Sequence, residues 1–256
     1  MASDETLSAI VATLEQSQNI LFITGAGVSA DSGLPTYRGI GGLYNEEDTD
    51  DGIPIEEALS GRVLLRNMEL TWKHIGRIEA ACRGAGFNRA HEVMALFEER
   101  FERVCVLTQN VDGFHQAAGS KNVIPIHGDF HDLLCMECAH RTRVANYADL
   151  ELPPRCPECG DYYRPEVVLF GEMLPLREVQ RLQDELARGF DVIFSVGTTS
   201  VFPYIAQPIL QSRYRDTLTV EINPGQTEVS RYVDIKVAGG AAKTLDGLWS
   251  ELVAAG

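Results

Sequence analysis

Four cysteines have the spacing of a metal site. They form two Cys-x-x-Cys pairs, Cys135/Cys138 and Cys156/Cys159, with seventeen residues between the pairs. Each short turn presents two thiolates, and two such turns can close a tetrahedron around one zinc ion. Because four thiolates leave no coordination position for water, we expect structural zinc rather than catalytic zinc, and we favour zinc over four free thiols.

A glycine-rich turn near the N-terminus could bind phosphate. Gly25-x-Gly27-x-x-Ala30 follows the apolar run 19–24, so the backbone can approach a pyrophosphate and the N–H groups of a following helix can face it. Such turns are common, and the indication is weak by itself. Dehydrogenases also need a second strand that ends in an acid about 20 residues later, and that stretch is here a Gly-rich, acidic loop. We therefore expect a dinucleotide without hydride transfer.

Polar side chains follow the apolar run 104–108. Gln109, Asn110 and Asp112 come directly after it, where ligands bind in open α/β sheets. Asn and Asp also favour helix N-caps, and this alternative remains open. Of the six histidines, His127 is the best placed for a general base, because it follows the apolar residues 123–126 and precedes Gly128. Its local competitors are His115 and His131.

The elements that position these residues alternate between strands and helices. Buried strands are expected at 19–24, 104–108, 192–196 and 217–222, and helices at 5–17, 55–60, 62–80, 89–101, 176–188 and 244–253. This rhythm predicts an α/β fold with a Rossmann-like, doubly wound parallel sheet. Two segments interrupt it: a loop at 39–54, expected to be mobile, and the cysteine-bearing segment 131–164, which reads as a zinc ribbon. We expect a Rossmann-like domain of residues 1–38, 85–130 and 165–256, and a small domain of 39–84 (cofactor loop and helical insertion) and 131–164.

Composition excludes several classes of protein. The 256 residues are 45% apolar, which allows a full core, and the net charge is −15. Nucleic-acid binding is not expected, because phosphate contacts need a basic face. No apolar run is long enough to span a membrane. Residues 1–19 lack a basic start and an apolar core, and the cysteines suit a reducing compartment, so a cytoplasmic location is expected.

Seven blocks together resemble the sirtuins, the NAD-dependent protein lysine deacylases, and a bacterial member is expected. They cover about residues 7–252 in the family order, and the set is far more specific than any one block. The blocks are Gly25-Ala26-Gly27-Val28-Ser29-Ala30-Asp31-Ser32-Gly33-Leu34-Pro35-Thr36-Tyr37-Arg38, Thr108-Gln109-Asn110-Val111-Asp112, His127-Gly128, the cysteine quartet, Arg164–Glu172, Gly197-Thr198-Thr199-Ser200 and Ile222-Asn223-Pro224.

The resemblance implies a role for each block. His127 would be the general base for the ribose hydroxyls, and Asn110 and Asp112 would share the catalytic site. A substrate peptide would pair with the strand edge at Val168, Phe170 and Gly171, a form of β-augmentation. The residues implied to contact NAD are Gly25, Ala26, Gly27, Tyr37, Arg38, Gln109, Asn110, Asp112, His127, Gly197, Thr198, Thr199, Asn223, Pro224, Gly225 and Ala241.

The sequence departs from the family at a few positions. Tyr37 stands where Phe is usual and keeps the ring that would shield the reacting carbon, and Phe114 stands where Leu is usual. A subgroup that removes succinyl and malonyl groups has a Tyr-x-x-Arg pair on the small-domain helix. Alignment places Trp72 and Ile75 at those positions, although Lys73 and Arg77 are close. Neutral acyl groups are therefore expected.

These features predict an NAD-dependent protein-lysine deacetylase acting on acylated lysine in proteins or peptides. It would convert NAD and acetyl-lysine into nicotinamide, O-acetyl-ADP-ribose and free lysine, with the metal serving only the fold. Two other readings stay open: a mono-ADP-ribosyltransferase, and a non-catalytic protein that binds NAD or ADP-ribose. The second has no use for a base such as His127.

Overall fold

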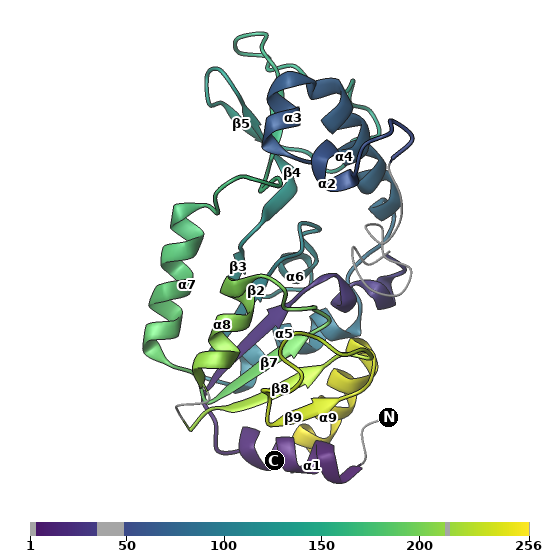
Figure 1. Cartoon of the computed structure of the whole chain (residues 1–256). Coiled ribbons are helices and arrows are strands. Elements are labelled where there is room, and N and C mark those ends of the chain that lie inside the picture. Colours follow the sequence, from purple (N-terminus) through teal and green to yellow (C-terminus); the bar gives the residue numbers. More distant parts are fainter. Residues whose placement is uncertain (1–3, 35–48, 213–215, 256) are drawn as a thin grey trace.

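Six parallel strands form the main sheet of this computed structural model, which describes residues 4–34, 49–212 and 216–255 (Figure 1). The strands are β1 (Asn19–Thr24), β2 (Arg103–Thr108), β3 (Val123–Pro125), β7 (Val192–Val196), β8 (Leu218–Ile222) and β9 (Ile235–Val237). Their order is β3-β2-β1-β7-β8-β9, which is the Rossmann order with a switch point between β1 and β7. The predicted Rossmann-like sheet is confirmed.

Helices cover both faces of this sheet because side chains alternate along each strand. Ile20 and Phe22 of β1 join a buried cluster with α1 (Asp4–Leu14), α5 (Arg89–Arg100) and α9 (Ala241–Ala255). Leu21 and Ile23 join the opposite cluster, with α7 (Leu176–Arg188) and α8 (Pro203–Ser212). Helix α8 was not predicted from the sequence, because it contains Pro208 and proline usually interrupts a helix.

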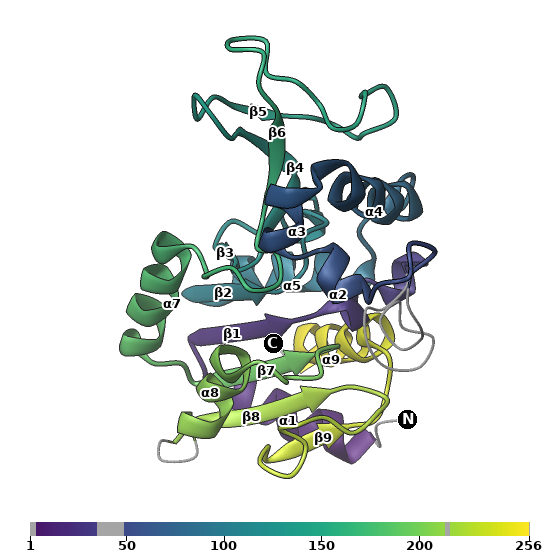
Figure 2. The ribbon, with the colours of Figure 1, turned by 45° about the horizontal axis from the view of Figure 1, so that its top comes forward.

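A small lobe stands above the main sheet (Figure 2). Its antiparallel sheet has the order β5-β4-β6, from β4 (Gly128–Cys135), β5 (Arg141–Arg143) and β6 (Tyr163–Val167). Helices α2 (Ile55–Ala58), α3 (Gly61–Arg66) and α4 (Met68–Cys82) share a buried cluster with that sheet, in which Trp72, Leu133 and Tyr163 are almost fully buried. No helix in the described ranges is both long and apolar enough to cross a membrane.

The structure corrects two predicted elements. The helix expected at 62–80 is two helices, because Asn67 lies outside helical geometry (φ −148°, ψ 75°) and its side chain caps α4 by accepting a hydrogen bond from the Leu70 N–H. The helix expected directly after the glycine turn is not formed within the described residues up to Leu34. Two 3₁₀ turns, η1 (Ala26–Val28) and η2 (Ala30–Ser32), take its place, and Gly33 ends the second in the left-handed region (φ 83°).

Candidate functional site

A cavity of about 940 Å³ lies where the main sheet meets the small lobe. Most of the residues predicted to bind the dinucleotide or the peptide line it, and Tyr37 and Arg38 lie outside the described residues. Asp112 lines a side pocket of about 20 Å³ that shares Ala26 and Asn110 with the large cavity. The predicted residues on the wall of the large cavity are Gly25, Ala26, Gly27, Gln109, Asn110, His127, Val168, Phe170, Gly171, Gly197, Thr198, Thr199, Asn223, Pro224, Gly225 and Ala241.

Two glycines let the turns at the switch point touch. The Gly27 N–H donates to the Gly197 carbonyl at 2.8 Å. A Cβ added at Gly27 would lie 2.7 Å from Gly197 Cα, and one added at Gly197 would lie 2.4 Å from the backbone nitrogen of Val28. Gly197 also has a φ of +60°, which L side chains rarely adopt. Backbone therefore lines the cavity at the point where a pyrophosphate would need close approach.

Amide side chains join the ends of the strands at the cavity floor. The Gln109 amide donates to Thr198 Oγ1 at 2.7 Å and to the Thr24 carbonyl at 3.2 Å. Asn110 Nδ2 donates to the Gly25 carbonyl at 3.2 Å and to Ser29 Oγ at 3.1 Å. These contacts join the turn after β1 to the segment after β2, so the predicted residues meet although they are far apart in the sequence.

Asp112 supports the start of a helix and also lines the side pocket. Its Oδ1 accepts from the Phe114 N–H at 3.0 Å, which supports the start of α6 (Phe114–Ala117), and its Oδ2 accepts from Ser29 Oγ at 2.8 Å. Burial raises the pKa of Asp112, although these two donors oppose the rise. Ser29 had no separate prediction, because only the fold brings its hydroxyl to this carboxyl.

His127 is held in one tautomer. Its Nδ1 lies 3.0 Å from the Gln109 carbonyl oxygen, which can only accept, so Nδ1 carries the proton. Its Nε2 therefore has the lone pair of a base, and lies 2.6 Å from the Tyr204 hydroxyl. Burial lowers the pKa of His127, against the Gln109 hydrogen bond, so the ring is neutral at physiological pH. This neutral, cavity-lining imidazole can accept a proton.

The competing histidines lie elsewhere. His131 Nδ1 contacts Asp129 Oδ1 at 2.8 Å, and His131 does not line the cavity. His115 is fully buried, with Nε2 2.9 Å from Thr24 Oγ1 and its ring centroid 4.8 Å from that of His91. Both buried rings have lowered pKa values, that of His91 about 4, chiefly because burial disfavours the charged form.

These two buried histidines predict acid sensitivity. Their folded pKa values lie below the unfolded value near 6.5, so the unfolded chain binds more protons between about pH 6.5 and 4. The free energy of unfolding should be fully retained above pH 6.5 and fall by up to about 3 kcal/mol through His91 as the pH drops to 4, and His115 should add to the fall in the same direction. Denaturant unfolding across this range measures the fall.

The matched variant for that experiment is His91→Gln. Glutamine can still accept from the Asn88 N–H, which His91 Nδ1 does now at 3.2 Å, as in a capping box. We expect this variant to lose less stability in acid than the wild type. The cysteine quartet also makes stability depend on pH, but it does so equally in both proteins, so their difference at each pH isolates His91. If the free energy of unfolding had the same pH slope in both proteins, His91 would be ruled out as a source of the acid sensitivity.

A buried ion pair fixes the loop after β8. Glu221 is fully buried, and its carboxylate accepts from Lys236 Nζ and Ser230 Oγ, both at 2.7 Å. Lys236 Nζ also donates to the Gly225 carbonyl at 2.7 Å. Asn223 joins this loop to the next strand end, donating from Nδ2 to the Thr198 carbonyl at 3.1 Å. The sequence analysis did not find the pair, since a lone Glu on an apolar strand gives no sign of its partner.

The segment proposed for peptide binding follows β6. The Arg164 guanidinium binds both carboxylate oxygens of Glu172 at 2.7 and 2.8 Å, and Glu172 also accepts from the Leu169 N–H at 3.0 Å. Both backbone groups of Phe170 pair with the segment that leads into α3: its N–H donates to the Leu59 carbonyl at 3.0 Å, and its carbonyl accepts from the Gly61 N–H at 3.1 Å. The Val168 N–H likewise donates to the His127 carbonyl at 2.9 Å, so much of the backbone of this segment is already paired within the chain.

Helix α4 of the small lobe exposes only Ile75 of the aligned pair, Trp72 and Ile75, to the cavity. Trp72 is fully buried in the lobe core, with Nε1–H donating to the Tyr163 carbonyl at 3.1 Å, and it does not line the cavity. Ile75 and Ile78 line the cavity instead, three residues apart on one helix face. The nearby cations are engaged elsewhere: Lys73 contacts Asp51 at 2.6 Å and Arg77 contacts Asp50 at 2.9 Å.

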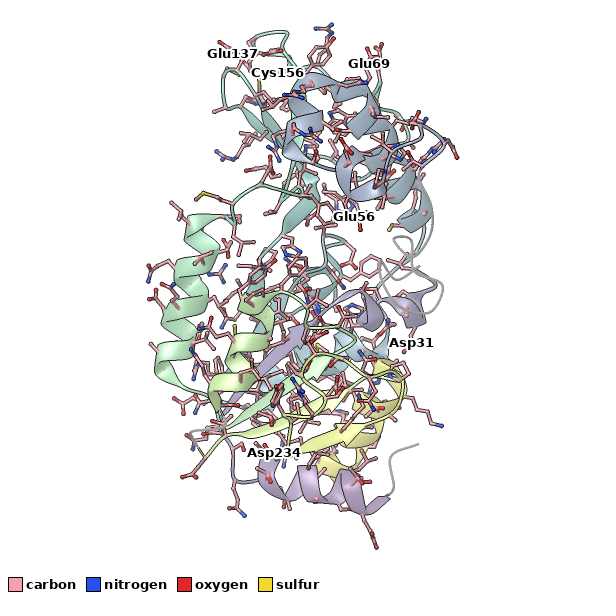
Figure 3. The ribbon with its side chains drawn as sticks, in the orientation of Figure 1. Asp31, Glu56, Glu69, Glu137, Cys156 and Asp234 are labelled. Atoms are coloured by element: carbon pink, nitrogen blue, oxygen red, sulfur yellow. The ribbon has the colours of Figure 1, made fainter. Side chains whose placement is uncertain are left out.

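The four cysteines converge at the tip of the small lobe. All four Sγ atoms lie within 4.8 Å of one another; Cys135 and Cys159 are 3.4 Å apart, and Cys138 and Cys156 3.7 Å. Zinc–sulfur bonds of about 2.3 Å imply tetrahedral edges of about 3.8 Å, so the set fits Zn²⁺. Figure 3 shows Cys156 near Glu137, at the opposite end of the lobe from the main sheet, which suits a structural ion.

Comparison with known proteins identifies close relatives. The model of the Sir2 family matches residues 25–203. A protein of Pseudomonas aeruginosa named NAD-dependent protein deacylase 2 is 46% identical over 244 residues, covering 94% of this chain and 95% of its own.

Two solved structures share the whole fold. A Sir2 homologue in complex with NAD has a TM-score of 0.86 at 34% identity, covering 97% of this chain and 94% of its own. A Sir2 variant with a deacetylated p53 peptide and 3′-O-acetyl-ADP-ribose has a TM-score of 0.84 at 25% identity, covering 96% of this chain and 98% of its own.

Proposed function

The chain belongs to the Sir2 family, and from that membership we propose that it is an NAD-dependent protein-lysine deacetylase. The observation that carries the proposal is the geometry of His127: Nδ1 contacts the Gln109 carbonyl, and the basic Nε2 lies at a cavity lined by the predicted dinucleotide residues and by Val168–Gly171. The products would be nicotinamide, O-acetyl-ADP-ribose and free lysine. Relatives named as deacylases and a structure holding an acetyl-ADP-ribose product support this assignment.

We assign the residues as follows. Nicotinamide would leave from a ribose carbon of NAD, and a hydroxyl of the same ribose would accept the acyl group. Backbone at Gly25, Ala26, Gly27 and Gly197 would hold the phosphates, while Asn110 and Asp112 would border the nicotinamide. His127 would take a proton from a ribose hydroxyl. The remaining contacts would come from Tyr37, Arg38, Gln109, Thr198, Thr199, Asn223, Pro224, Gly225 and Ala241.

The test measures nicotinamide release with and without an acetyl-lysine peptide, together with mass detection of O-acetyl-ADP-ribose. A deacetylase releases nicotinamide in step with that product, and only when the peptide is present. Release without it, with ADP-ribose attached to another nucleophile, identifies a mono-ADP-ribosyltransferase. Binding of NAD without release identifies a non-catalytic binder.

We propose that neutral acyl groups are preferred. Ile75 and Ile78 offer only apolar contact, and burying a carboxylate without a cation costs several kcal/mol. On one peptide, kcat/KM should be about 100-fold higher for acetyl-lysine than for succinyl-lysine, since each tenfold corresponds to about 1.4 kcal/mol. Ile78→Arg should lower the acetyl-to-succinyl ratio of kcat/KM, because it supplies a cation for the carboxylate. Arg77→Ala should leave it unchanged, and a succinyl rate equal to the acetyl rate would contradict the preference.

We also propose the predicted domain division, with residues 1–38, 85–130 and 165–256 forming the NAD-binding domain and residues 39–84 and 131–164 the small domain. The separate sheet and the separate hydrophobic cluster of the small lobe support it, although β4 and β6 each cross a boundary by a few residues. A cytoplasmic location is proposed from the six cysteines, none of which forms a disulfide.

A further inference from the structure

The lone pair of the proposed base is already occupied by a tyrosine. His127 Nδ1 donates to the Gln109 carbonyl, so Nε2 can only accept, and the Tyr204 hydroxyl must donate to it across 2.6 Å. Tyr204 lies 77 residues from His127 in the sequence, in the first turn of α8, and lines the same cavity. Any hydroxyl that gives its proton to His127 therefore has to reach Nε2 past Tyr204 or through it.

Packing holds the tyrosine ring in place. The rings of Tyr204 and Phe202 are stacked, with centroids 5.5 Å apart and planes 13° apart. Both rings meet the imidazole nearly at right angles, at 6.0 Å for Tyr204 and 5.8 Å for Phe202. Because these contacts are made by the ring and not by the hydroxyl, removing the hydroxyl should leave the ring where it is.

A phenol oxygen that donates its proton keeps lone pairs and can accept from a second hydroxyl. We propose that Tyr204 is a proton relay between the ribose hydroxyl of the reacting sugar and Nε2 of His127. The ribose oxygen bonds to the acyl carbon as its O–H bond breaks, and one bond of the carbon–nitrogen double bond of the O-linked acyl group opens to leave its electron pair on the lysine nitrogen. The ribose proton passes to the Tyr204 oxygen. The proton of Tyr204 passes at the same time to Nε2, which leaves tyrosine neutral and His127 cationic.

Burial suits Tyr204 to this role, since it raises the pKa of the phenol to about 12. The group stays protonated at neutral pH, so the donor to Nε2 is always present. Direct contact between the ribose and Nε2 would first require breaking the existing hydrogen bond, whereas a relay keeps it. The relay rests on the proposed function, because it concerns the step that forms the acyl ester of ADP-ribose.

The test is Tyr204→Phe, which keeps the ring and removes the proton. In a single turnover, the rate of peptide-dependent nicotinamide release, which precedes the base-assisted step, should stay within about threefold of wild type, and this shows that the site is folded. Formation of O-acetyl-ADP-ribose should fall by about 10- to 100-fold, below the full range for general-base loss. In a His127→Ala background, Tyr204→Phe should have no further effect, because the relay then leads nowhere.

The pH profile gives a second measurement. The Tyr204 donor stabilises neutral His127, so its loss should raise the apparent pKa of the base in product formation. Unchanged or faster product formation in Tyr204→Phe would overturn the relay and make Tyr204 a group that merely covers the base. A wild-type protein that releases no nicotinamide with acetyl-peptide would instead reject the proposed function, whatever the variant does.

Discussion

Replacing His127 with alanine is expected to lower O-acetyl-ADP-ribose formation by about 10²–10⁴-fold, the usual range for general acid–base catalysis. The reason is geometric. The Gln109 carbonyl fixes the proton on Nδ1, burial keeps the ring neutral, and Nε2 is therefore the basic atom at the cavity. Removing the ring removes the proton acceptor and leaves the cavity walls in place.

The two halves of the reaction should respond differently. Nicotinamide release needs no base, so its rate in a single turnover should fall much less than the rate of product formation in the same His127→Ala sample. His131→Asn is the matched control, because His131 contacts Asp129 and does not line the cavity, and we expect near-normal turnover. Near-normal product formation by His127→Ala would remove His127 from the role of base.

Loss of one cysteine of the quartet should unfold the small lobe. Structural zinc contributes about 10–16 kcal/mol of apparent binding free energy at pH 7, comparable to the whole stability of a typical domain. Cys135 is 2% exposed and belongs to the same cluster as Trp72 and Tyr163. Cys135→Ala should therefore lose the metal, lose the order of β4–β6 and lose activity together.

Metal content and tryptophan fluorescence measure these losses. The chain has two tryptophans, and the fully buried Trp72 should shift its emission to longer wavelength when the lobe opens. Cys82→Ser is the control for a change of thiol, since Cys82 is not part of the quartet, and it should keep the metal. A folded, metal-free Cys135→Ala protein with full activity would show that the site has no structural role.

Local sequence patterns predicted the elements that depend on local interactions. The apolar runs at 19–24 and 192–196 are β1 and β7, and the apolar periodicity at 176–188 is α7. Where a side chain changes the backbone path, the pattern misled: Asn67 divides one expected helix into two. Pro208 argued against a helix in the sequence. Helix α8 forms nevertheless, because its packing against the sheet outweighs the lost backbone hydrogen bond.

The sequence alone identified the cysteine quartet, the glycine turn and His127 as candidates, because each is recognised from residue types a few positions apart. The tertiary structure decided which atoms meet. It placed Gly27 against Gly197, turned Ile78 rather than Trp72 to the cavity, and brought Tyr204 to Nε2 of His127. Such contacts arise when separate strands and helices pack together, and neither periodicity nor motif spacing encodes the distance between them.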